Sequence, residues 1–333
     1  MAKKHNDTDY LSISTRVRAL ETRLIRRERL EQILEAGSDD EAAKLLQDSG
    51  YPGVDPANPE QMDAALAAVR RETLEELAGG MPDERYLDLF RLKYDYHNSK
   101  ALLKAAAMNV SPDRMLMDMG TVPADQLRRA VEEDDLDGLP ATLAVAIREG
   151  KSVLDETRDP QLADMALDSR YYQQLLALAE ETGSAFLKGY VQLQIDAANL
   201  RIWVRTQRMG KGVGFLRNAL FAGGTLTPDR LVDAAESGKE LEAVYLATPL
   251  QEAAAAGQQA CSGGTLTEFE KLCDDVVSQY LEKARFVPFG EAPLLGYLAA
   301  RETEYANLRI VLMGRTSGLP KDVIVSRLRA SYV

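Results

Sequence analysis

Three segments of the sequence carry the same polar side chains at the same spacing, and these are the residues whose types could do chemistry. An acid lies three residues before an asparagine, and a base lies two residues after it. The three sets are Asp95, Asn98 and Lys100; Asp196, Asn199 and Arg201; and Glu304, Asn307 and Arg309. One such set could form a ligand site, a buried polar link or an interaction hot spot. Three copies favour a structural role, because binding residues seldom survive in every copy of a repeat.

We therefore predict hydrogen bonds for these residues rather than catalysis. Each asparagine is expected to bond to backbone within its own repeat unit, since buried amides need partners. Each acid and each base is expected to pair with a neighbouring helix. The copies lie 101 and 108 residues apart, which is the length of one small domain. Eleven positions past each asparagine comes Asn109, Gly210 or Gly318, residue types that tolerate the left-handed conformation closing a helix.

A second pattern repeats in the same order. Leu30, Leu127 and Leu231 each open a short helical element, and in the last two copies Pro123 and Pro228 lie near a first helical turn. Whole units were therefore duplicated, each with five or six helices. We predict the units 1–108, 109–213 and 214–333. Three similar bodies can close around a pseudo-threefold axis or stack as a solenoid, and the repeat alone does not choose.

Composition supports an all-α fold. Leu, Ala, Glu and Arg are plentiful, aromatic content is 6%, and no alternating strand pattern occurs. From Tyr10 to about Gly37 the apolar residues recur at helical spacing, which predicts one long amphipathic helix. Ser38 is then the expected N-cap of a second, short helix.

Other signs of chemistry are weak. The chain has no P-loop, and the glycines of "GKGVGF" lack the preceding strand that a dinucleotide site requires. His5 lies near the start, and His97 occupies a position filled by Ala198 and Ala306 in the other copies, which favours a packing or surface role. The acidic run "EEDDLD" breaks into Gly138 and reads as a solvated turn rather than a magnesium site. We expect no catalytic, cofactor-binding or metal-binding residue.

Charge and cysteine usage exclude further classes. The formal net charge is −12, which disfavours nucleic acid as a partner. Residues 1–34, however, hold eight Lys or Arg against five acids, an asymmetry that suits docking onto charged protein faces. Cys261 and Cys273 form no C-x-x-C motif, so a reducing compartment fits best. No apolar run approaches the ~20 residues of a membrane span, so we expect a protein that is soluble or peripheral to a membrane.

The segments "DYLSISTRVRALETRLI", "LFRLKYDYHNSKALLKA" and "EYANLRIVLMGRTSGLPKDVIVSRLRASYV" resemble the C subunits of the archaeal and bacterial V/A-type rotary ATPases, the counterparts of the eukaryotic V-ATPase d subunit. The likeness spans Tyr10 to Val333, with Ser99 where the family commonly has Leu. It implies a funnel of three similar helical domains about a pseudo-threefold axis. It also implies a non-catalytic central-stalk protein without a cofactor, which couples ATP hydrolysis or synthesis to H⁺ or Na⁺ movement.

The resemblance also implies partners and a location. These are the D- and F-type subunits of the rotor shaft and the membrane proteolipid ring, with the protein cytoplasmic and peripheral to the membrane. We expect Arg23, Arg26 and Arg27 to lie on or near a partner-facing surface. Two other hypotheses stay open here: an all-helical Mg-dependent enzyme acting on a diphosphate or lipid substrate, and a general helical scaffold.

Overall fold

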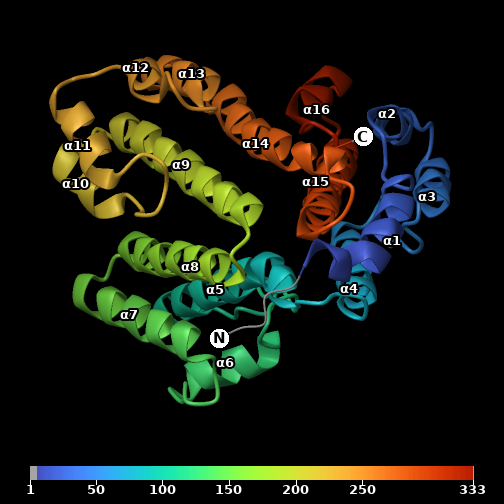
Figure 1. Ribbon diagram of the computed structural model, residues 1–333, viewed down its shortest axis with the longest axis horizontal. Helices are drawn as coiled ribbons and strands as arrows, with labels where there is room; N and C mark the ends of the chain where they lie inside the picture. Colours follow the sequence, from blue (N-terminus) through green and yellow to red (C-terminus); the bar gives the residue numbers. More distant parts are fainter. Residues whose placement is uncertain (1–5, 333) are drawn as a thin grey trace. The chain divides into compact units, whose positions relative to one another are not determined.

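The structure is a computed structural model of the chain and describes residues 6–332. These residues form sixteen α-helices and two short 3₁₀-helices and contain no strand, so the predicted all-α class is confirmed (Figure 1). The helices are η1 (Asp7–Tyr10), α1 (Leu11–Glu21), α2 (Arg27–Glu35), α3 (Asp39–Asp48), α4 (Pro59–Ala78), α5 (Arg85–Met108), α6 (Ala124–Glu132), α7 (Ala141–Thr157), α8 (Pro160–Thr182), α9 (Ala185–Arg208), α10 (Val213–Ala219), α11 (Pro228–Glu236), α12 (Leu241–Tyr245), α13 (Gln251–Cys261), α14 (Leu266–Glu282), η2 (Lys283–Phe286), α15 (Glu291–Thr316) and α16 (Lys321–Arg327).

The three polar sets lie on the three longest helices, α5, α9 and α15. Each of these helices is followed by a residue in the left-handed conformation, as predicted. The values of φ are 52° at Asn109, 64° at Gly210 and 64° at Gly318. This conformation ends a helix because it turns the next N–H groups back toward the last free carbonyls.

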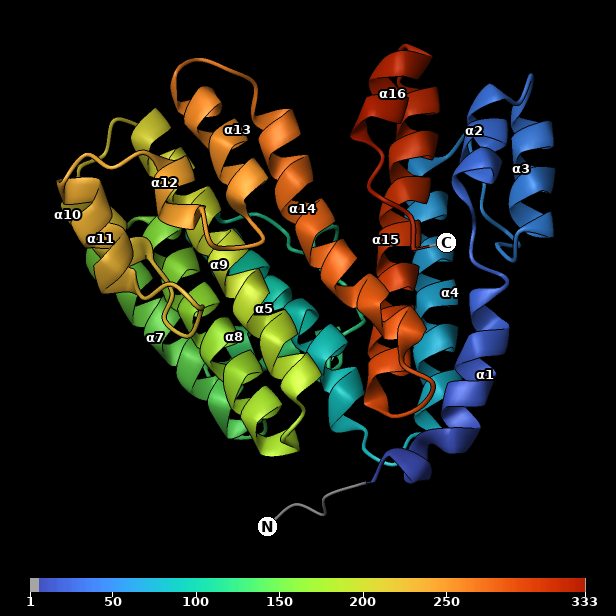
Figure 2. The same cartoon turned by 45° about the horizontal axis from the view of Figure 1, so that its top comes forward.

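The described residues fall into two compact units. The first contains Glu84–Ile202 and Gly210–Ser237, and the second contains residues 6–83, Trp203–Met209 and 238–332. The predicted division into 1–108, 109–213 and 214–333 stays a prediction. In the first unit α5, α7 and α8 pack against one another (Figure 2). Their apolar faces meet in a core that includes Leu103, Ile147 and Leu167.

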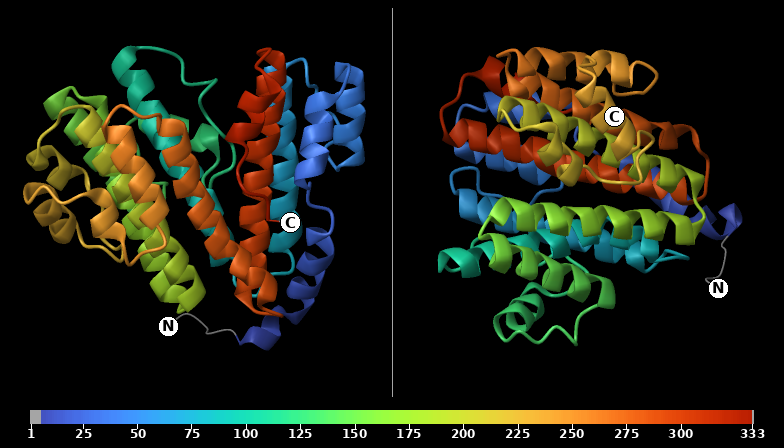
Figure 3. Two further views of the ribbon diagram at one scale, coloured as in Figure 1. Left: turned by 90° about the horizontal axis from the view of Figure 1, so that it is seen from above. Right: turned by 90° about the vertical axis from the view of Figure 1, so that its left-hand side faces the viewer.

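The second unit is built around α15. This helix packs against α1, α2, α4, α14 and α16, and it runs beside α4 in Figure 2 and in the left view of Figure 3. Its core joins Leu30 and Ile33 of α2 with Leu308 and Val311 of α15. Helices from the two ends of the sequence therefore share one hydrophobic core.

The predicted long helix from Tyr10 to about Gly37 is wrong, because the chain breaks between α1 and α2. Leu24 and Ile25 in the break are both buried, and Arg26 is extended with ψ 162°. The N–H of Ile25 donates to the Glu304 side chain rather than to a helical carbonyl. A tertiary hydrogen bond thus replaces a helical one. Ser38 caps α3 as expected, since its hydroxyl accepts the N–H of Glu41 at 3.2 Å.

The repeated short element is confirmed. Helices α2, α6 and α11 each have nine residues. Leu30, Leu127 and Leu231 are the fourth residue of each helix and are at most 1% exposed. Pro228 is the first residue of α11 and Pro123 immediately precedes α6, where a missing N–H costs nothing.

Candidate functional site

The repeated acids hold the segments that lead into the short helices. The Asp95 carboxylate accepts the Thr121 N–H at 3.0 Å, the Thr121 hydroxyl at 2.7 Å and the Val122 N–H at 3.1 Å. Thr121 and Val122 come just before α6. The side chain therefore acts as a fixed acceptor for a backbone turn and orients the start of the next helix.

The second copy repeats this arrangement. Asp196 accepts the Thr225 N–H at 3.0 Å, the Thr225 hydroxyl, and the Leu226 N–H at 3.2 Å. These donors precede α11 as Thr121 and Val122 precede α6. The two acids do not pair with bases on neighbouring helices, so that prediction is wrong for them. Backbone N–H groups take the place of a cation because they reach the buried carboxylate without bringing a second charge with them.

A glycine makes each of these approaches possible. A Cβ placed on Gly120 would lie 2.0 Å from Oδ1 of Asp95, and one placed on Gly224 would lie 2.2 Å from Oδ1 of Asp196. Real Cβ atoms do not come that close to another heavy atom. The dipeptides Gly120-Thr121 and Gly224-Thr225 are thus part of the site, and the recurring "GT" before each proline was the sequence signal for them.

The third copy uses different partners. Glu304 accepts the N–H of Ile25, the hydroxyl of Tyr51 and a guanidinium N–H of Arg301, the last at 2.5 Å. Ile25 precedes α2, so the third long helix holds the first short helix. Glutamate has one methylene more than aspartate and reaches the turn from farther away. No glycine is needed: Gly120 and Gly224 lie two residues before Val122 and Leu226, and the corresponding residue two before Ile25 is Arg23.

The asparagines bind backbone with both ends of the amide. Asn98 donates to the Met117 carbonyl at 2.8 Å and accepts the Met117 N–H at 2.9 Å. Asn199 does the same with Phe221 at 2.8 Å and 2.8 Å, and Asn307 with Arg329 at 3.1 Å and 2.9 Å. The expected bond to backbone is present in all three copies. For Asn98 and Asn199, however, the backbone lies past the predicted unit boundary rather than inside the same unit.

We call each acid and asparagine, with the backbone that they hold, a clasp. Each clasp joins a long helix to the segment before a short helix, except that Arg329 in the carboxyl-terminal segment takes the asparagine bonds in the third. All six side chains are at most 5% exposed. Sequence spacing identified these residues, but among their partners only the repeated Gly-Thr dipeptides gave a sequence signal, because the partners are mostly main-chain groups.

Two of the repeated bases pair with neighbouring helices, as predicted. Nζ of Lys100 lies 2.7 Å from Oδ1 of Asp168 on α8, and Nε of Arg309 lies 2.9 Å from Oδ1 of Asp63 on α4. Arg201 lies on α9 near Tyr172, where burial raises the pKa of the phenol to about 12 and the charge of Arg201 acts in the opposite direction.

Burial shifts the pKa of all three acids in the same direction. Removal from water raises the pKa of Asp95 and Asp196, and the hydrogen bonds from the threonine and backbone donors lower it in part. Burial likewise raises the pKa of Glu304, while the charge of Arg301 opposes the rise. All three carboxylates accept hydrogen bonds from backbone and side-chain groups of the protein itself, which is the contact pattern of a structural link.

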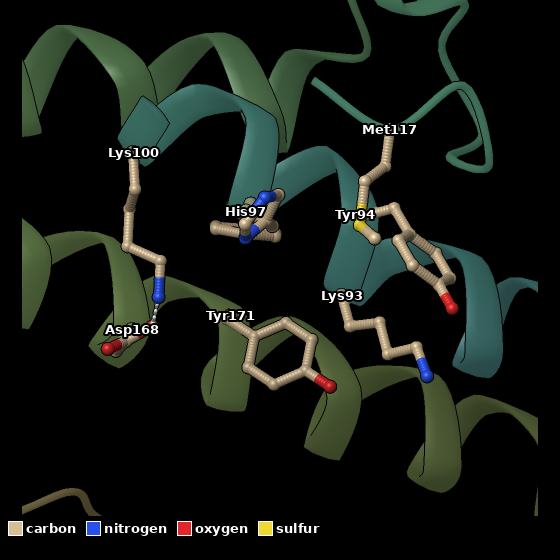
Figure 4. A pocket seen from close by; sticks show the side chains of 8 residues that line it. Lys93, Tyr94, His97, Lys100, Met117, Asp168 and Tyr171 are labelled. Carbon is tan, nitrogen blue, oxygen red and sulfur yellow. Dashed lines mark hydrogen bonds and ion pairs between the residues drawn. The ribbon is translucent and has the colours of Figure 1, made fainter. Parts of the chain in front are cut away.

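A pocket of about 280 Å³ lies beside the first clasp, in the first unit (Figure 4). It is lined by Lys93, Tyr94, Tyr96, His97 and Lys100 of α5, Met117, and Asp168 and Tyr171 of α8. Its one carboxylate is bound to a lysine, and Nε2 of His97 lies 2.9 Å from the Met115 carbonyl. His97 is exposed and contacts backbone, in keeping with its predicted role. The lining offers no free acid–base pair.

The remaining candidates are on the surface. Arg23, Arg26 and Arg27 are exposed around the buried Leu24 and Ile25, and Arg27 lies 3.1 Å from Glu31. Their role toward a partner stays a prediction. The acidic residues of "EEDDLD" are exposed, and one of them, Asp134, forms an ion pair with Lys151 of α7, with Nζ 2.6 Å from Oδ1. Within residues 6–332 no cluster of three His, Cys, Asp or Glu is placed to hold a metal ion, and no helix has the length and apolarity to cross a bilayer.

The family of ATP synthase (C/AC39) subunits matches residues 13–327, which contain all three clasps except the extreme carboxyl-terminal Arg329. The chain belongs to this family. Membership makes it a non-catalytic component of a V/A-type rotary ATPase, and it sets aside the magnesium-dependent enzyme.

Similar members of the C/AC39 family come from bacteria and archaea. The C subunit of the V-type sodium ATPase of Enterococcus hirae is 24% identical over 97% of this chain and 99% of its own length. The C subunit of the A-type ATP synthase of Methanocaldococcus jannaschii is 27% identical, over 96% of this chain and 86% of its own. The C subunit of the V-type ATP synthase of Thermus thermophilus is 27% identical, over 94% and 96%.

Proposed function

We propose that this C/AC39 protein is the central-stalk socket of its rotary ATPase. In this role it receives the D- and F-type subunits of the rotor shaft on one side and sits on the membrane proteolipid ring on the other. Rotation then passes between ATP chemistry and H⁺ or Na⁺ transport. The observation that carries the proposal is the family match, because it covers residues 13–327 and extends over nearly the full length of several relatives.

The same proposal includes the shape and place of the molecule. Three modules would surround a pseudo-threefold axis as a funnel, at the cytoplasmic face of the membrane. Three clasps of one design and three nine-residue helices, α2, α6 and α11, support a threefold repeat. The closure of the third clasp onto the first short helix supports a ring of modules rather than an open stack, because an open stack leaves its last module without a successor.

A torque coupler must resist twisting, and the clasps suit that task. Each fixes the start of a short helix to the middle of a long one through buried hydrogen bonds, which have few alternative geometries. A buried polar group that loses its partner costs about 1–3 kcal/mol, so a clasp resists opening under load. The exposed Arg23, Arg26 and Arg27 would add charge on a face presented to a partner.

The direct test is reconstitution of the complex with and without this chain. With the chain, the shaft should co-purify with the proteolipid ring and ATP hydrolysis should drive ion uptake into vesicles. Without it, hydrolysis by the catalytic head should continue while ion uptake stops. Equal co-purification of shaft and ring in its absence would overturn the proposal.

The charged face has its own test within the same assay. Reversing Arg23, Arg26 and Arg27 together to Glu should reduce co-purification of ring and shaft. The matched control reverses Arg128, Arg148 and Lys151, which lie in the other unit and pair with exposed acids. Unchanged assembly of the first triple variant would reject the assignment of these arginines to a partner-facing surface.

A further inference from the structure

The turn between α14 and α15 exposes the most solvent-accessible large apolar side chain of the described residues. Phe286 is 88% exposed, and Phe289 three residues later is 38% exposed. Both belong to residues 283–290, which we call the phenylalanine turn; it lies in the second unit (Figure 2). Full burial of a Phe side chain contributes about 1.5–3 kcal/mol, so leaving Phe286 in water forgoes that stabilisation.

The turn is exposed although its backbone is firmly held. The Arg18 guanidinium donates to the carbonyls of Ala284 and Val287 at 2.7 Å and 2.5 Å. The Ser14 hydroxyl donates to the Gly290 carbonyl at 3.3 Å, and Arg285 donates to the Tyr332 carbonyl at 2.7 Å. Two side chains of α1 therefore fix the backbone of the turn, and the turn's own Arg285 ties it to Tyr332, while the Phe286 side chain is left in solvent.

The residues that hold the turn are themselves connected. Both oxygens of Glu21 accept from Arg18 at 2.8 Å, and one of them also accepts the Tyr332 hydroxyl at 3.0 Å. Ala284 is fully buried against α15, where a Cβ on Gly296 would lie 2.6 Å from the Ala284 Cβ. This support predetermines the position of Phe286, as expected for a binding anchor that loses little entropy on association.

The feature is confined to one of the three repeats. The long helices α5 and α9 are preceded by residues 79–84, "GGMPDE", and residues 183–184, "GS", and neither connection contains an aromatic residue. Only the connection before α15 carries phenylalanines. A role in maintaining the repeated fold would be expected in all copies, so the difference points to a contact that one module makes and the others do not.

The surroundings favour a protein partner over a lipid surface. Two phenylalanines and one exposed lysine, Lys283, are too few for stable membrane anchoring, which requires a larger apolar face or a polybasic patch. Arg285 is engaged with Tyr332, and Glu282 and Glu291 flank the turn. The net charge of −12 also opposes approach to anionic lipid. Aromatic side chains, in contrast, are typical anchors at the centre of protein interfaces.

We propose that Phe286 inserts into an apolar slot on another protein of the rotary ATPase, with Phe289 covering its edge and Lys283 facing carboxylate or carbonyl groups at the rim. The proposal rests on the proposed function, since it requires assembly into that complex. It adds that a single side chain of the third module fixes the angular position of this protein against its partner. Three equivalent contacts would leave three equivalent orientations.

The test compares matched variants in the reconstituted complex. Phe286→Ala should weaken binding of the chain to the rest of the complex roughly tenfold or more, as for an interface hot spot. The control is Leu246→Ala, which removes another side chain of the same unit that is 61% exposed, and it should leave binding within about twofold. Both variants should unfold at the wild-type temperature, because neither side chain is packed in the core.

A second measurement identifies the partner. Phe286→p-benzoylphenylalanine in the assembled complex should form a photocrosslink to another protein of the complex, whereas the same replacement at Leu246 should not. Binding by Phe286→Ala that equals wild type, or crosslinking of position 286 to phospholipid only, overturns the inference while leaving the socket function intact. Failure of the wild-type chain to assemble at all would overturn the socket function and the inference with it.

Discussion

The first two clasps and the third do the same mechanical work with different chemistry. Asp95 and Asp196 hold main-chain N–H groups that lie 26 to 30 residues further along the sequence. Glu304 holds an N–H group 279 residues away and adds Tyr51 and Arg301. Where the held segment follows the helix directly, a glycine and a short acid are sufficient. Where the segment comes from the other end of the chain, a longer acid and two further side chains make the contact.

The difference has an electrostatic consequence. The aspartates bring one charge each into a site whose donors are neutral, so the carboxylate alone is desolvated. The third clasp pairs a buried carboxylate with a guanidinium whose side chain is 12% exposed, and Arg301 also lies 5.3 Å and 5.0 Å from the ring centres of Tyr51 and Tyr305. Its stability therefore depends on both ions being present.

The largest effect should come from breaking that ion pair. Glu304→Ala leaves the mostly enclosed Arg301 without its carboxylate and the buried Ile25 N–H without its acceptor, so the free energy of unfolding should fall by about 3–5 kcal/mol. Urea unfolding followed by circular dichroism measures it. The control Arg309→Ala removes an exposed pair with Asp63 and should cost less than about 1 kcal/mol. Equal losses of unfolding free energy in the two variants would show that the third clasp stabilises the fold no more than an exposed ion pair does.

A smaller loss is expected from the glycines of the aspartate clasps. Gly120→Ala or Gly224→Ala forces the turn away from its carboxylate, which should cost about 1–3 kcal/mol, the range found for overpacked sites. Gly138→Ala is the matched control, since a Cβ there meets no atom within 4 Å and the backbone is not in the left-handed region. Thermal unfolding measures both. A tolerated Gly120→Ala together with an intact Asp95 contact would contradict the proposed need for close approach.

The three asparagines should contribute equally to the free energy of unfolding, although the three acids should not. Asn98→Ala, Asn199→Ala and Asn307→Ala each remove two backbone hydrogen bonds of similar length, so each should cost about 1–3 kcal/mol. Denaturant unfolding of the three variants gives the comparison. A loss confined to one copy would mean that the three amides are not equivalent in energy, although their geometry is.

The smallest effect concerns pH. Burial raises the pKa of Asp95 in the folded protein above its value of about 3.9 in the unfolded chain, so the folded state keeps the proton to higher pH. The contribution of this group to stability is therefore complete below the unfolded pKa and decreases as pH rises through the folded pKa. Asp95→Asn should flatten the dependence of unfolding free energy on pH above that unfolded pKa, measured by urea titration; a steeper dependence would reverse the sign of the argument.

The acids and asparagines of the clasps could be predicted from the sequence because their spacing follows helix geometry. Acid and asparagine three residues apart share a helix face, and Asn109, Gly210 and Gly318 closed the helices as their residue types predicted. The break at Leu24 and Ile25 could not be predicted, because the apolar pattern continues through it and only the distant Glu304 explains the turn. At this break the hydrogen bond from Ile25 to Glu304 outweighs the local preference of the chain for helix.

Other parts of the site gave partial or no signal. The dipeptides Gly120-Thr121 and Gly224-Thr225 were visible as a repeat, but their contact with the aspartates depends on a backbone approach that sequence does not encode locally. The contribution of α8 to the pocket could not be predicted, because Asp168 and Tyr171 lie about 70 residues along the sequence from the α5 residues that they face. The exposure of Phe286 could not be predicted either, since a phenylalanine after a helix is usually packed against the core.

The reach of the third clasp also governs when the molecule can be completed during its synthesis. The first unit has all of its residues once Ser237 has left the ribosome, and both aspartate clasps can form at that stage. Helices α1 to α4 must meanwhile remain without Glu304 and without the core contacts of α15. The amino-terminal helices are thus made first and secured last, and a nascent chain halted before residue 304 would present their unsatisfied apolar faces to chaperones.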